Sequence, residues 1–349
     1  MTEALFVSCT PGLEAPLSQE LAGMGLEARV VTGGCEVNAA PAGSVVRVNV
    51  QSRLASRVSW RLGQLDSPAA IVRLPVRQLL GPGPFQLGIS EEPGARSAVP
   101  AEVWRNAAVK AWGVLGEGPE LSFRLSRAGC TVSVDTSGEL LHLRGARQET
   151  GKAPLRETLA SGVLRLCGWK PGEPLWDVMC GSGTFVIEAA EQAMGLQPGR
   201  ARPFAFQSFA SFDAKAFAEA LAPAAPVSTW VRGSDLNAGA LGVARRNAKR
   251  AGIFETIELE RLDATTLVRP SGAPGLVIAN LPYGKRVGQR FELHGLYQGV
   301  GAALRRSLSG WRFGFLLAEG EDALGLAIEA KTPVKNGGIW CQVVTGRIP

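Results

Sequence analysis

A mixed α/β architecture, with an open, doubly wound parallel sheet in its second half, is predicted for this chain. From about residue 151 onward, short apolar runs alternate with segments of helical period, as in repeated β-α units. Several of these runs end in an acidic or polar residue, at the edge where open α/β sheets bind ligands. The first half differs, because its strand and helix patterns follow the order of small α+β units.

Length and charge set limits on the number of domains and on the kind of partner. A chain of 349 residues is long enough for two or three domains, each with its own core. The formal net charge of +6 suits a partner that carries phosphates, although many soluble proteins are equally basic. The charge therefore permits a nucleic-acid partner without proving one.

Cysteine and histidine content restricts the chemistry. Six scattered cysteines form no CxxC pair, which argues against a zinc site or a disulfide framework and fits a reduced, cytoplasmic setting. Two histidines do not suffice for a histidine-rich metal site. The N-terminus lacks a signal-peptide pattern, and no run approaches the roughly 18 apolar residues of a membrane span. We expect a cytoplasmic monomer that needs neither a metal nor a membrane.

Residues 1–65 are expected to form a small ferredoxin-like unit, because their patterns follow the order β-α-β-β-α. The expected strands cover residues 5–9, 28–31 and 45–50, and the expected helices cover residues 13–21 and 54–62. On the second helix, Arg53, Arg57 and Arg61 recur every four residues and share one face. We favour a solvated surface over a nucleic-acid contact for these arginines.

Residues 66–150 form a second, basic α+β unit in this interpretation. Prolines interrupt the first half of the segment, and a helix pattern covers residues 101–115. Strand patterns follow at residues 121–125, 130–134 and 140–143. Taken by themselves, these residues indicate only a basic domain that precedes the parallel sheet.

The junction between the two halves carries the longest specific motif of the chain. It reads RGAR at residues 144–147, followed by APLRETLA at residues 153–160. Leu155, Leu159, Val163 and Leu166 then define one face of a helix. This pattern closely resembles the junction of the THUMP-containing ribosomal and transfer RNA guanine-N2 methyltransferases.

The resemblance implies a function for each part of the chain. Residues 66–150 would be a THUMP domain, which binds RNA through its shape and its phosphates. Residues 151–349 would be a Rossmann-like methyltransferase domain that uses S-adenosyl-L-methionine. The helix after the junction would line the cofactor pocket, with Arg156, Glu157 and Thr158 close to the cofactor. A linker helix with an ordinary ion pair is the alternative for this segment.

A glycine-rich turn follows the first expected strand of the parallel sheet. Glycine allows a close approach of the backbone to a ligand, and the N-terminus of the next helix favours a carboxylate. A phosphate-binding lysine is missing, which disfavours a nucleoside triphosphate. The string resembles the family sequence Asp-Pro-Met-Cys-Gly-Ser-Gly-Thr except at Val178, and Asp177 could receive the cofactor ammonium. The cofactor-binding residues predicted here are Asp177, Met179, Cys180, Gly181, Ser182, Gly183 and Thr184.

Acidic residues also end the next two expected strands. Asp235, followed by Leu236 and Asn237, stands where a carboxylate can bind two ribose hydroxyls. Asp263, followed by Ala264, could accept a hydrogen bond from an adenine amino group. An ordinary helix cap is the alternative for Asp235, but its register with Asp177 favours a cofactor that contains a ribose.

The tetrapeptide Asn280-Leu281-Pro282-Tyr283 ends a fourth apolar run and points to the reaction. The lone pair of a nucleobase amino group is delocalised, and two acceptors aimed at its protons localise it again. Asn280 would supply a side-chain oxygen and Leu281 a carbonyl oxygen, while Pro282 restricts the backbone. Tyr283 offers a flat surface for stacking. The tetrapeptide resembles motif IV, Asp/Asn-x-Pro-Tyr/Phe, of methyltransferases that act on amino groups.

Three segments near these motifs have weaker signals. The insertion at residues 198–213 mixes phenylalanine with arginine, which suits either base stacking or packing at a sheet edge. Its form resembles the 23S ribosomal RNA branch of the family more than the transfer RNA branch. Lys285 and Arg286 add positive charge where a nucleic-acid backbone would pass. Residues 332–340 predict a terminal hairpin centred on Asn-Gly.

Together these patterns predict an S-adenosyl-L-methionine-dependent RNA methyltransferase that forms N2-methylguanosine. Ribosomal RNA is favoured as the substrate, and transfer RNA is the alternative. An adenine-N6 methyltransferase of nucleic acids and a non-catalytic RNA-binding protein are further alternatives. Guanine and adenine are not separable by physical argument, because both present an amino group to the same two acceptors.

Overall fold

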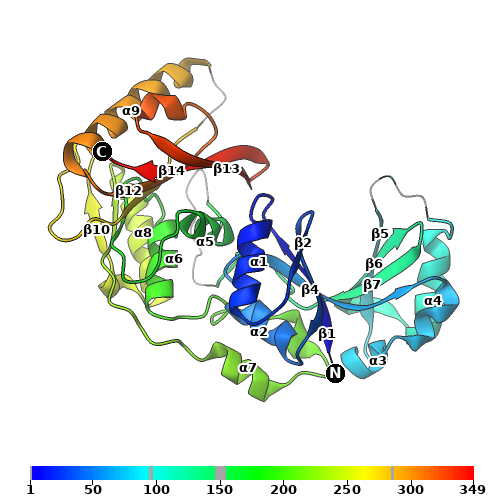
Figure 1. Cartoon of the computed structure of the whole chain (residues 1–349). Coiled ribbons are helices and arrows are strands. Elements are labelled where there is room, and N and C mark those ends of the chain that lie inside the picture. Colours follow the sequence, from blue (N-terminus) through cyan, green and yellow to red (C-terminus); the bar gives the residue numbers. More distant parts are fainter. Residues whose placement is uncertain (1, 93, 95–96, 146–154, 284–286) are drawn as a thin grey trace. The chain divides into compact units, whose positions relative to one another are not determined.

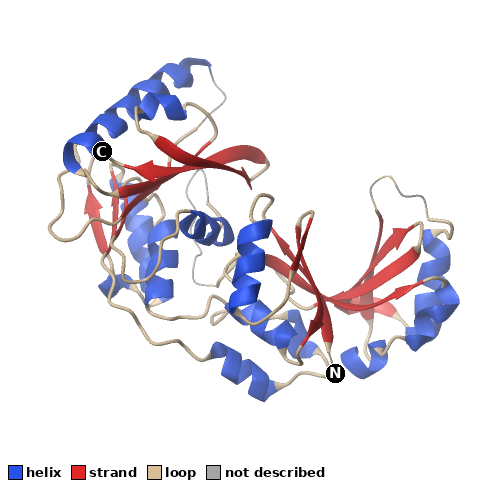
Figure 2. Ribbon diagram, viewed as in Figure 1, coloured by secondary structure: helices blue, strands red, loops and turns tan. Residues whose placement is uncertain are grey.

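The chain divides into two compact units, each with its own sheet (Figure 1). The computed structural model describes residues 2–92, 94, 97–145, 155–283 and 287–349. Unit 1 comprises Met1–Cys9, Leu17–Leu141 and Arg202–Leu221. Unit 2 comprises Thr10–Pro16, His142–Ala201 and Ala222–Pro349. Over the described residues, each sheet contains seven strands (Figure 2).

The N-terminal part of unit 1 has the expected ferredoxin-like topology. Its elements are β1 (Glu3–Cys9), α1 (Glu14–Gly23), β2 (Arg29–Val31), β3 (Gly34–Ala40), α2 (Ser44–Gln51) and β4 (Ala55–Leu65). The strands lie in the order β2-β3-β1-β4, and neighbours are antiparallel. The β-α-β-β-α order is present, but strand β3 was not expected, and the last two expected elements have the opposite type.

The strand expected at residues 45–50 is wrong, because these residues form α2. The valines that suggested a strand bury one side of the helix instead. The carboxylate of Glu3, on β1, accepts hydrogen bonds from the N–H groups of Gly43 at 2.9 Å and Val45 at 2.7 Å. These bonds pair backbone N–H groups at the start of the helix that would otherwise lack a partner. Such tertiary contacts override the preference of the valines for a strand.

The helix expected at residues 54–62 is also wrong, because these residues belong to strand β4. A spacing of four residues places side chains on one face of a strand as well as on one face of a helix. Arg57 is paired with Asp135, and Arg61 Nη1 lies 2.5 Å from Glu36 Oε1. Two of the three arginines thus make ion pairs within the sheet.

The same sheet continues beyond residue 65. It adds η1 (Pro68–Arg73), α3 (Val76–Leu80), β5 (Phe85–Glu91), α4 (Ala101–Trp112), β6 (Leu115–Ser126) and β7 (Gly129–Asp135). Strand β4 pairs with β1 on one side and with β7 on the other, and β6 and β5 follow. Residues 141 and 142 form a turn and residues 140 and 143 belong to no helix or strand, so the strand expected there is wrong. The domain division at residue 65 stays a prediction.

The aromatic insertion packs inside unit 1. Phe204 and Phe206, near η2 (Ala205–Ser208), are buried and stacked with their ring centres 5.1 Å apart. Arg202 donates to the carbonyls of Leu140 at 2.6 Å and Glu139 at 2.7 Å. The segment continues into α7 (Ala214–Leu221), which contacts α2. Of the two alternatives for the insertion, these contacts support packing rather than base stacking.

Unit 2 contains the parallel sheet. Its elements are α5 (Glu157–Leu166), β8 (Leu175–Asp177), α6 (Thr184–Ala193), β9 (Val231–Asp235), α8 (Ala238–Ala251), η3 (Phe254–Thr256), β10 (Glu258–Arg261), β11 (Leu276–Asn280), α9 (Val287–Ser307), β12 (Arg312–Leu317), η4 (Glu321–Leu324), β13 (Ile328–Asn336) and β14 (Ile339–Arg347). The strand order is β10-β9-β8-β11-β12-β14-β13, and the first five are parallel. This order confirms the doubly wound, Rossmann-like prediction.

Helices cover both faces of this sheet, as Figure 1 shows. Tyr297, Val300 and Leu304 of α9 pack into one apolar cluster with the strands β8, β11 and β12. A separate cluster joins α6 to α8 through Ile187 and Ala248. The strands are therefore buried from both sides, which explains their continuous apolar runs.

The terminal hairpin is present. Strands β13 and β14 pair in antiparallel fashion up to Asn336 and Ile339, so the turn consists of Gly337 and Gly338. Both glycines have positive φ, at 54° and 94°, as a tight hairpin turn requires. The turn centre thus lies one residue beyond the expected Asn-Gly pair. Among the described residues, helices long and apolar enough to cross a membrane are absent.

Candidate active site

A cleft of about 560 Å³ opens at the carboxyl ends of β8, β9 and β11. Strand order reverses beside β8, and ligands of open α/β sheets bind at such a reversal. The volume is in the range of small-molecule sites. The cleft is lined by Met179, Gly181, Ser182, Asp235, Asn237, Gly239, Ala240, Val243, Asn280, Leu281, Pro282 and Tyr283.

The glycine-rich turn after β8 lines one side of the cleft. Gly181 has a φ of +53°, and a Cβ added to it would meet no atom within 4 Å. Gly183, with a φ of +88°, leads into the first turn of α6 at Thr184. The N–H of Cys180 donates to the carbonyl of Ser234 at 2.9 Å, which ties the turn to β9. The turn therefore offers open backbone to a ligand.

Asp177 lies beneath this turn and does not line the cleft. Its side chain is 1% exposed, and its Oδ1 accepts a hydrogen bond from the Met179 N–H at 3.1 Å. Burial raises the pKa of Asp177 well above its usual range, and the nearby Asp235 raises it further. A cation at the turn would relieve this cost.

Asp235 connects the turn after β8 to the helix after β9. Its Oδ2 accepts from the Gly181 N–H at 2.9 Å, and its Oδ1 accepts from the Asn237 N–H at 2.8 Å. Asn237 caps α8, because its Oδ1 accepts from the Gly239 N–H at 2.9 Å. Asn237 is thus the residue that caps the helix, while Asp235 keeps one further lone pair on each oxygen.

Asn280 presents an unusual buried acceptor. Its Oδ1 is buried, and among the described residues this oxygen has no hydrogen-bond partner. Leaving a buried amide oxygen unpaired costs about 1–3 kcal/mol, so the position is set up for a donor that binds there. Next to it, the Leu281 side chain is buried and the Leu281 N–H donates to the Leu316 carbonyl at 2.9 Å.

Two side chains that the sequence did not single out contact the tetrapeptide. Tyr297, on α9, donates from its hydroxyl to the Pro282 carbonyl at 2.7 Å. Asn336, at the end of β13, donates from Nδ2 to the Tyr283 hydroxyl oxygen at 2.6 Å. Both come from segments distant in sequence, so local motifs carry no signal for them.

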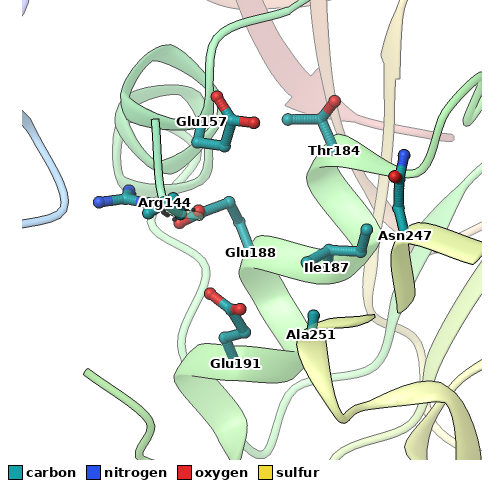
Figure 3. Close-up of a pocket in the computed structure, with 8 residues that line it drawn as sticks. All are labelled: Arg144, Glu157, Thr184, Ile187, Glu188, Glu191, Asn247 and Ala251. Atoms are coloured by element: carbon teal, nitrogen blue, oxygen red, sulfur yellow. Dashed lines mark hydrogen bonds and ion pairs between the residues drawn. The ribbon is translucent and has the colours of Figure 1, made fainter. Parts of the chain in front are cut away.

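A second, smaller pocket lies beside the cleft and contains a buried ion pair (Figure 3). Arg144 Nε donates to Glu188 Oε1 at 2.9 Å, and the Ser161 hydroxyl also donates to Glu188. Arg144 is 5% exposed and Glu188 1% exposed, and this carboxylate keeps the pKa of Arg144 high against the effect of burial. The pair joins the junction to α6, whose first residue, Thr184, lines this pocket and directly follows the glycine-rich turn.

Glu157 and Thr184 line this second pocket rather than the cleft, and Figure 3 shows both pointing into it. Asn247 of α8 lines it too, and its Nδ2 donates to the Ser182 carbonyl at 3.2 Å. Thr158 is buried within α5, whereas Arg156 is exposed at the start of that helix. The junction helix therefore reaches the vicinity of the turn through Glu157.

The other predicted residues lie at the edges of the site or outside it. Leu236 is 58% exposed, and Ala264 is buried in the core under α9. Asp263 Oδ1 accepts from the N–H and the hydroxyl of Thr265, both at 2.8 Å. None of these three lines the cleft. Lys285, Arg286 and residues 146–154 of the junction lie outside the described residues.

The residues of the cleft suit an organic cofactor. Within the described part of the chain, no group of three histidine, cysteine or acidic side chains is placed to hold a metal ion. The carboxylate of Asp235, the open backbone at Gly181 and the unpaired Asn280 oxygen fit a ligand with hydroxyl and amino donors. S-adenosyl-L-methionine has such groups.

Comparison with known proteins supplies the family. A family model described as "RMKL-like, methyltransferase domain" matches residues 144–342, which is more than half of the chain. The chain belongs to the RMKL-like methyltransferase family. A second model, described as "RlmL ferredoxin-like domain", matches residues 4–59 of this methyltransferase, in agreement with the topology of β1–β4.

Individual relatives of this RMKL-like methyltransferase fall into the same class. The putative RNA methyltransferase slr0064 of Synechocystis sp. is 38% identical over 229 residues, which is 62% of this chain. The chain spans 58% of the length of that relative.

Two solved structures share the fold over the entire chain. A predicted N6-adenine-specific DNA methylase from Listeria monocytogenes is 25% identical, with a TM-score of 0.86, and the match covers 100% of this chain and 97% of that one. SMU.472, a putative methyltransferase complexed with SAH (S-adenosylhomocysteine), is 23% identical, with a TM-score of 0.86, and the match covers 100% and 98%.

Proposed function

We propose that this chain is an S-adenosyl-L-methionine-dependent RNA methyltransferase that forms N2-methylguanosine, with 23S ribosomal RNA as the favoured substrate. The observation that carries the proposal is the buried, unpaired Oδ1 of Asn280, in the same cleft as Asp235. A nucleobase amine could donate a hydrogen bond to the unpaired Asn280 oxygen, and a nucleoside cofactor could donate to the Asp235 carboxylate. Both groups lie where the strand order of the sheet reverses, which is where such sheets bind ligands.

Asp235 and the turn after β8 would hold the cofactor. Each oxygen of Asp235 accepts one backbone N–H and retains a lone pair, so the carboxylate can accept from two ribose hydroxyls. The methionine end would lie over the turn, where Gly181 permits close approach and Asp177 offers negative charge. When bound, S-adenosyl-L-methionine supplies an electrophilic methyl group. The relative bound to SAH supports this choice of cofactor.

Asn280 and Leu281 would hold the amine. The Asn280 oxygen and the Leu281 carbonyl would accept its two protons, orient its lone pair and stabilise the positive charge that develops on nitrogen. A strong base is unnecessary, because the amine becomes acidic as the new bond forms. Tyr283 lines the same cleft and would stack on the base, which requires a flipped or unpaired nucleotide.

RNA is the proposed partner on different grounds. The net charge of +6 suits a phosphate-bearing substrate, and slr0064 is a putative RNA methyltransferase. Residues 66–150 are proposed to act as a THUMP-like RNA-binding domain. The preference for ribosomal over transfer RNA rests on the form of the insertion at residues 198–213. A cytoplasmic monomer remains part of the proposal.

The test is to methylate total RNA with radiolabelled S-adenosyl-L-methionine, separate ribosomal from transfer RNA, and identify the modified nucleoside. Label in 23S RNA as N2-methylguanosine is the expected result. Label in transfer RNA would move the proposal to the alternative substrate. A parallel assay with DNA tests the alternative: N6-methyladenosine in DNA would favour the activity in the name of the Listeria relative. Calorimetry that detects no cofactor binding would favour a non-catalytic RNA-binding protein.

Replacement of Asn280 by alanine should abolish turnover while cofactor affinity holds, because the side chain acts on the amine. Loss of one such acceptor is expected to lower kcat by about 10²–10³-fold. Asn280→Asp keeps an acceptor oxygen and should retain measurable turnover. Initial rates together with calorimetry check both variants, and an Asn280→Ala protein that turned over at the wild-type rate would exclude this role.

A further inference from the structure

Both tyrosines of the chain meet at the tetrapeptide. The sequence contains two, Tyr283 and Tyr297. Tyr283 belongs to the tetrapeptide, and the Tyr297 hydroxyl donates to the Pro282 carbonyl at 2.7 Å. Tyr297 therefore fixes the backbone just before Tyr283. The ring of Tyr283 needs a separate contact, and a residue of the terminal hairpin provides it.

The β13–β14 hairpin presents Asn336 to Tyr283. Val334 pairs with Cys341 and Asn336 with Ile339, so these four side chains share one face of the hairpin. Val334 and Cys341 are buried, and Asn336 continues this inner face to the turn. Its Nδ2 donates to the Tyr283 hydroxyl oxygen at 2.6 Å. On the opposite face of the same hairpin, Trp340 is 58% exposed.

We propose that Asn336 is a positioning residue for the acceptor site, which sets the orientation of the Tyr283 ring through this hydrogen bond. The inference rests on the proposed function, because it is the target base that would stack on this ring. The hairpin then becomes part of the substrate site, although its own side chains do not line the cleft.

The bond is suited to a fixed, permanent role. The first side-chain torsion of a tyrosine moves its hydroxyl oxygen, so a hydrogen bond at this oxygen restricts that torsion and holds the direction of the ring axis. Burial raises the pKa of Tyr283 to about 12, so the hydroxyl stays protonated at neutral pH. Asn336 belongs to the last residue pair of the hairpin, so the paired strands hold it on a regular element rather than on a loop.

Nuclear magnetic resonance of ring-labelled tyrosine tests the contact without reference to activity. Two tyrosines give two sets of ring signals, and Tyr297→Phe assigns them. Asn336→Ala should shift or broaden the Tyr283 signals and leave those of Tyr297 in place. Gln342→Ala is the matched control, because it removes an amide side chain from the opposite face of the same hairpin. Unchanged Tyr283 signals in Asn336→Ala would overturn the proposal.

Kinetics test the consequence for the substrate. Asn336→Ala should raise KM for RNA by about two- to tenfold, the net value of one hydrogen bond, with a smaller change in kcat and unchanged cofactor affinity. Asn336→Asp should restore most of the loss, since a carboxylate accepts from the tyrosine hydroxyl. In a Tyr283→Phe background, Asn336→Ala should add nothing. An equal loss in both backgrounds would mean that Asn336 acts elsewhere.

The outcomes separate the two proposals. If the wild-type protein methylates RNA and the Asn336→Ala variant has the same KM for RNA, only the proposed role of Asn336 is rejected. A wild-type protein that methylates no RNA would reject the proposed function, and with it a substrate-positioning role for Asn336, whatever the ring signals show.

Discussion

Asp177 and Asp235 end neighbouring parallel strands, yet their environments differ. Asp235 is held by two backbone N–H groups from two segments, whereas Asp177 is fully buried with one. An ionised carboxylate that is buried this way costs stability unless a cation accompanies it. Burial accordingly raises the pKa of Asp177. The folded protein thus favours the protonated form of this side chain more than the unfolded chain does.

Asp177→Asn should therefore stabilise the protein without cofactor and weaken cofactor binding. A raised carboxyl pKa means that stability falls as pH rises from the unfolded pKa through the folded one. The neutral amide removes this loss, so its advantage in Tm should be largest at pH 8 and vanish towards pH 4. Cofactor affinity should fall by about tenfold if the carboxylate receives the ammonium.

Thermal unfolding across pH and calorimetry measure these two effects. Asp235→Asn is the informative contrast, because an amide nitrogen in place of Oδ2 would face the Gly181 N–H. That variant should lose both stability and affinity. An Asp177→Asn protein that melted lower than wild type at pH 8 would contradict the assignment of burial as the dominant cost.

At the scale of elements, the edge strand β13 is paired with a segment from near the N-terminus. The Lys335 N–H donates to the Pro11 carbonyl at 3.0 Å, and a Cβ at Gly12 would lie 2.1 Å from the Pro333 carbonyl oxygen. Gly12 also has a φ of +96°. Exposed edge strands invite pairing with other chains, so this contact protects the sheet that carries Asn336.

Gly12→Ala should separate this segment from β13. Overpacking of this kind costs about 1–3 kcal/mol, and the Lys335 amide should lose its protection from hydrogen exchange. Gly25→Ala is a matched control, since Gly25 also has a positive φ, +73°, but would meet no atom within 4 Å. It tests backbone strain without the clash. Equal protection of Lys335 in both variants would show that the close approach is unimportant.

At the scale of the whole molecule, RNA binding depends more on which arginines are free of ion pairs than on the net charge of the chain. Arg29, Arg57 and Arg61 all make ion pairs with carboxylates of unit 1. Arg73 is exposed and, within the part of the chain that the structure describes, its side chain makes no hydrogen bond or ion pair. It lines a cleft of about 440 Å³ between η1, α3 and α4, in the segment proposed to bind RNA.

Arg73→Gln should therefore lower the salt dependence of RNA binding. Loss of one phosphate contact reduces the slope of log K against log salt by about 0.7–0.9. Arg29→Gln removes an exposed arginine whose charge is already paired with Glu36, and should change the slope less. Filter binding over a range of salt concentrations measures both. Identical slopes for the two variants would argue against RNA contact at this cleft.

The sequence by itself determined the parallel sheet and most of the residues that line the cleft at its edge. Buried parallel strands must be apolar throughout, and ligand-binding residues must follow them directly, so both signals are local. Asp235 and Asn280 were identifiable for this reason. The β-α-β-β-α order was also readable, but α2 and β4 were exchanged in type. A spacing of four fits both elements, and the Glu3 carboxylate that starts α2 comes from a distant strand.

Only the tertiary structure decided which side chains contact the tetrapeptide Asn280-Leu281-Pro282-Tyr283. Tyr297 lies 15 residues beyond Pro282, and Asn336 lies 53 residues beyond Tyr283. Neither belongs to a motif, because each contributes a single hydrogen bond whose partner is set by how α9 and the hairpin pack. The insertion at residues 198–213 is a further case, because its aromatic composition suited stacking on bases. The structure buries Phe204 and Phe206 in unit 1 instead. Short sequence motifs identify the residues that line the cleft, whereas the contacts that orient those residues depend on how distant segments pack in the fold.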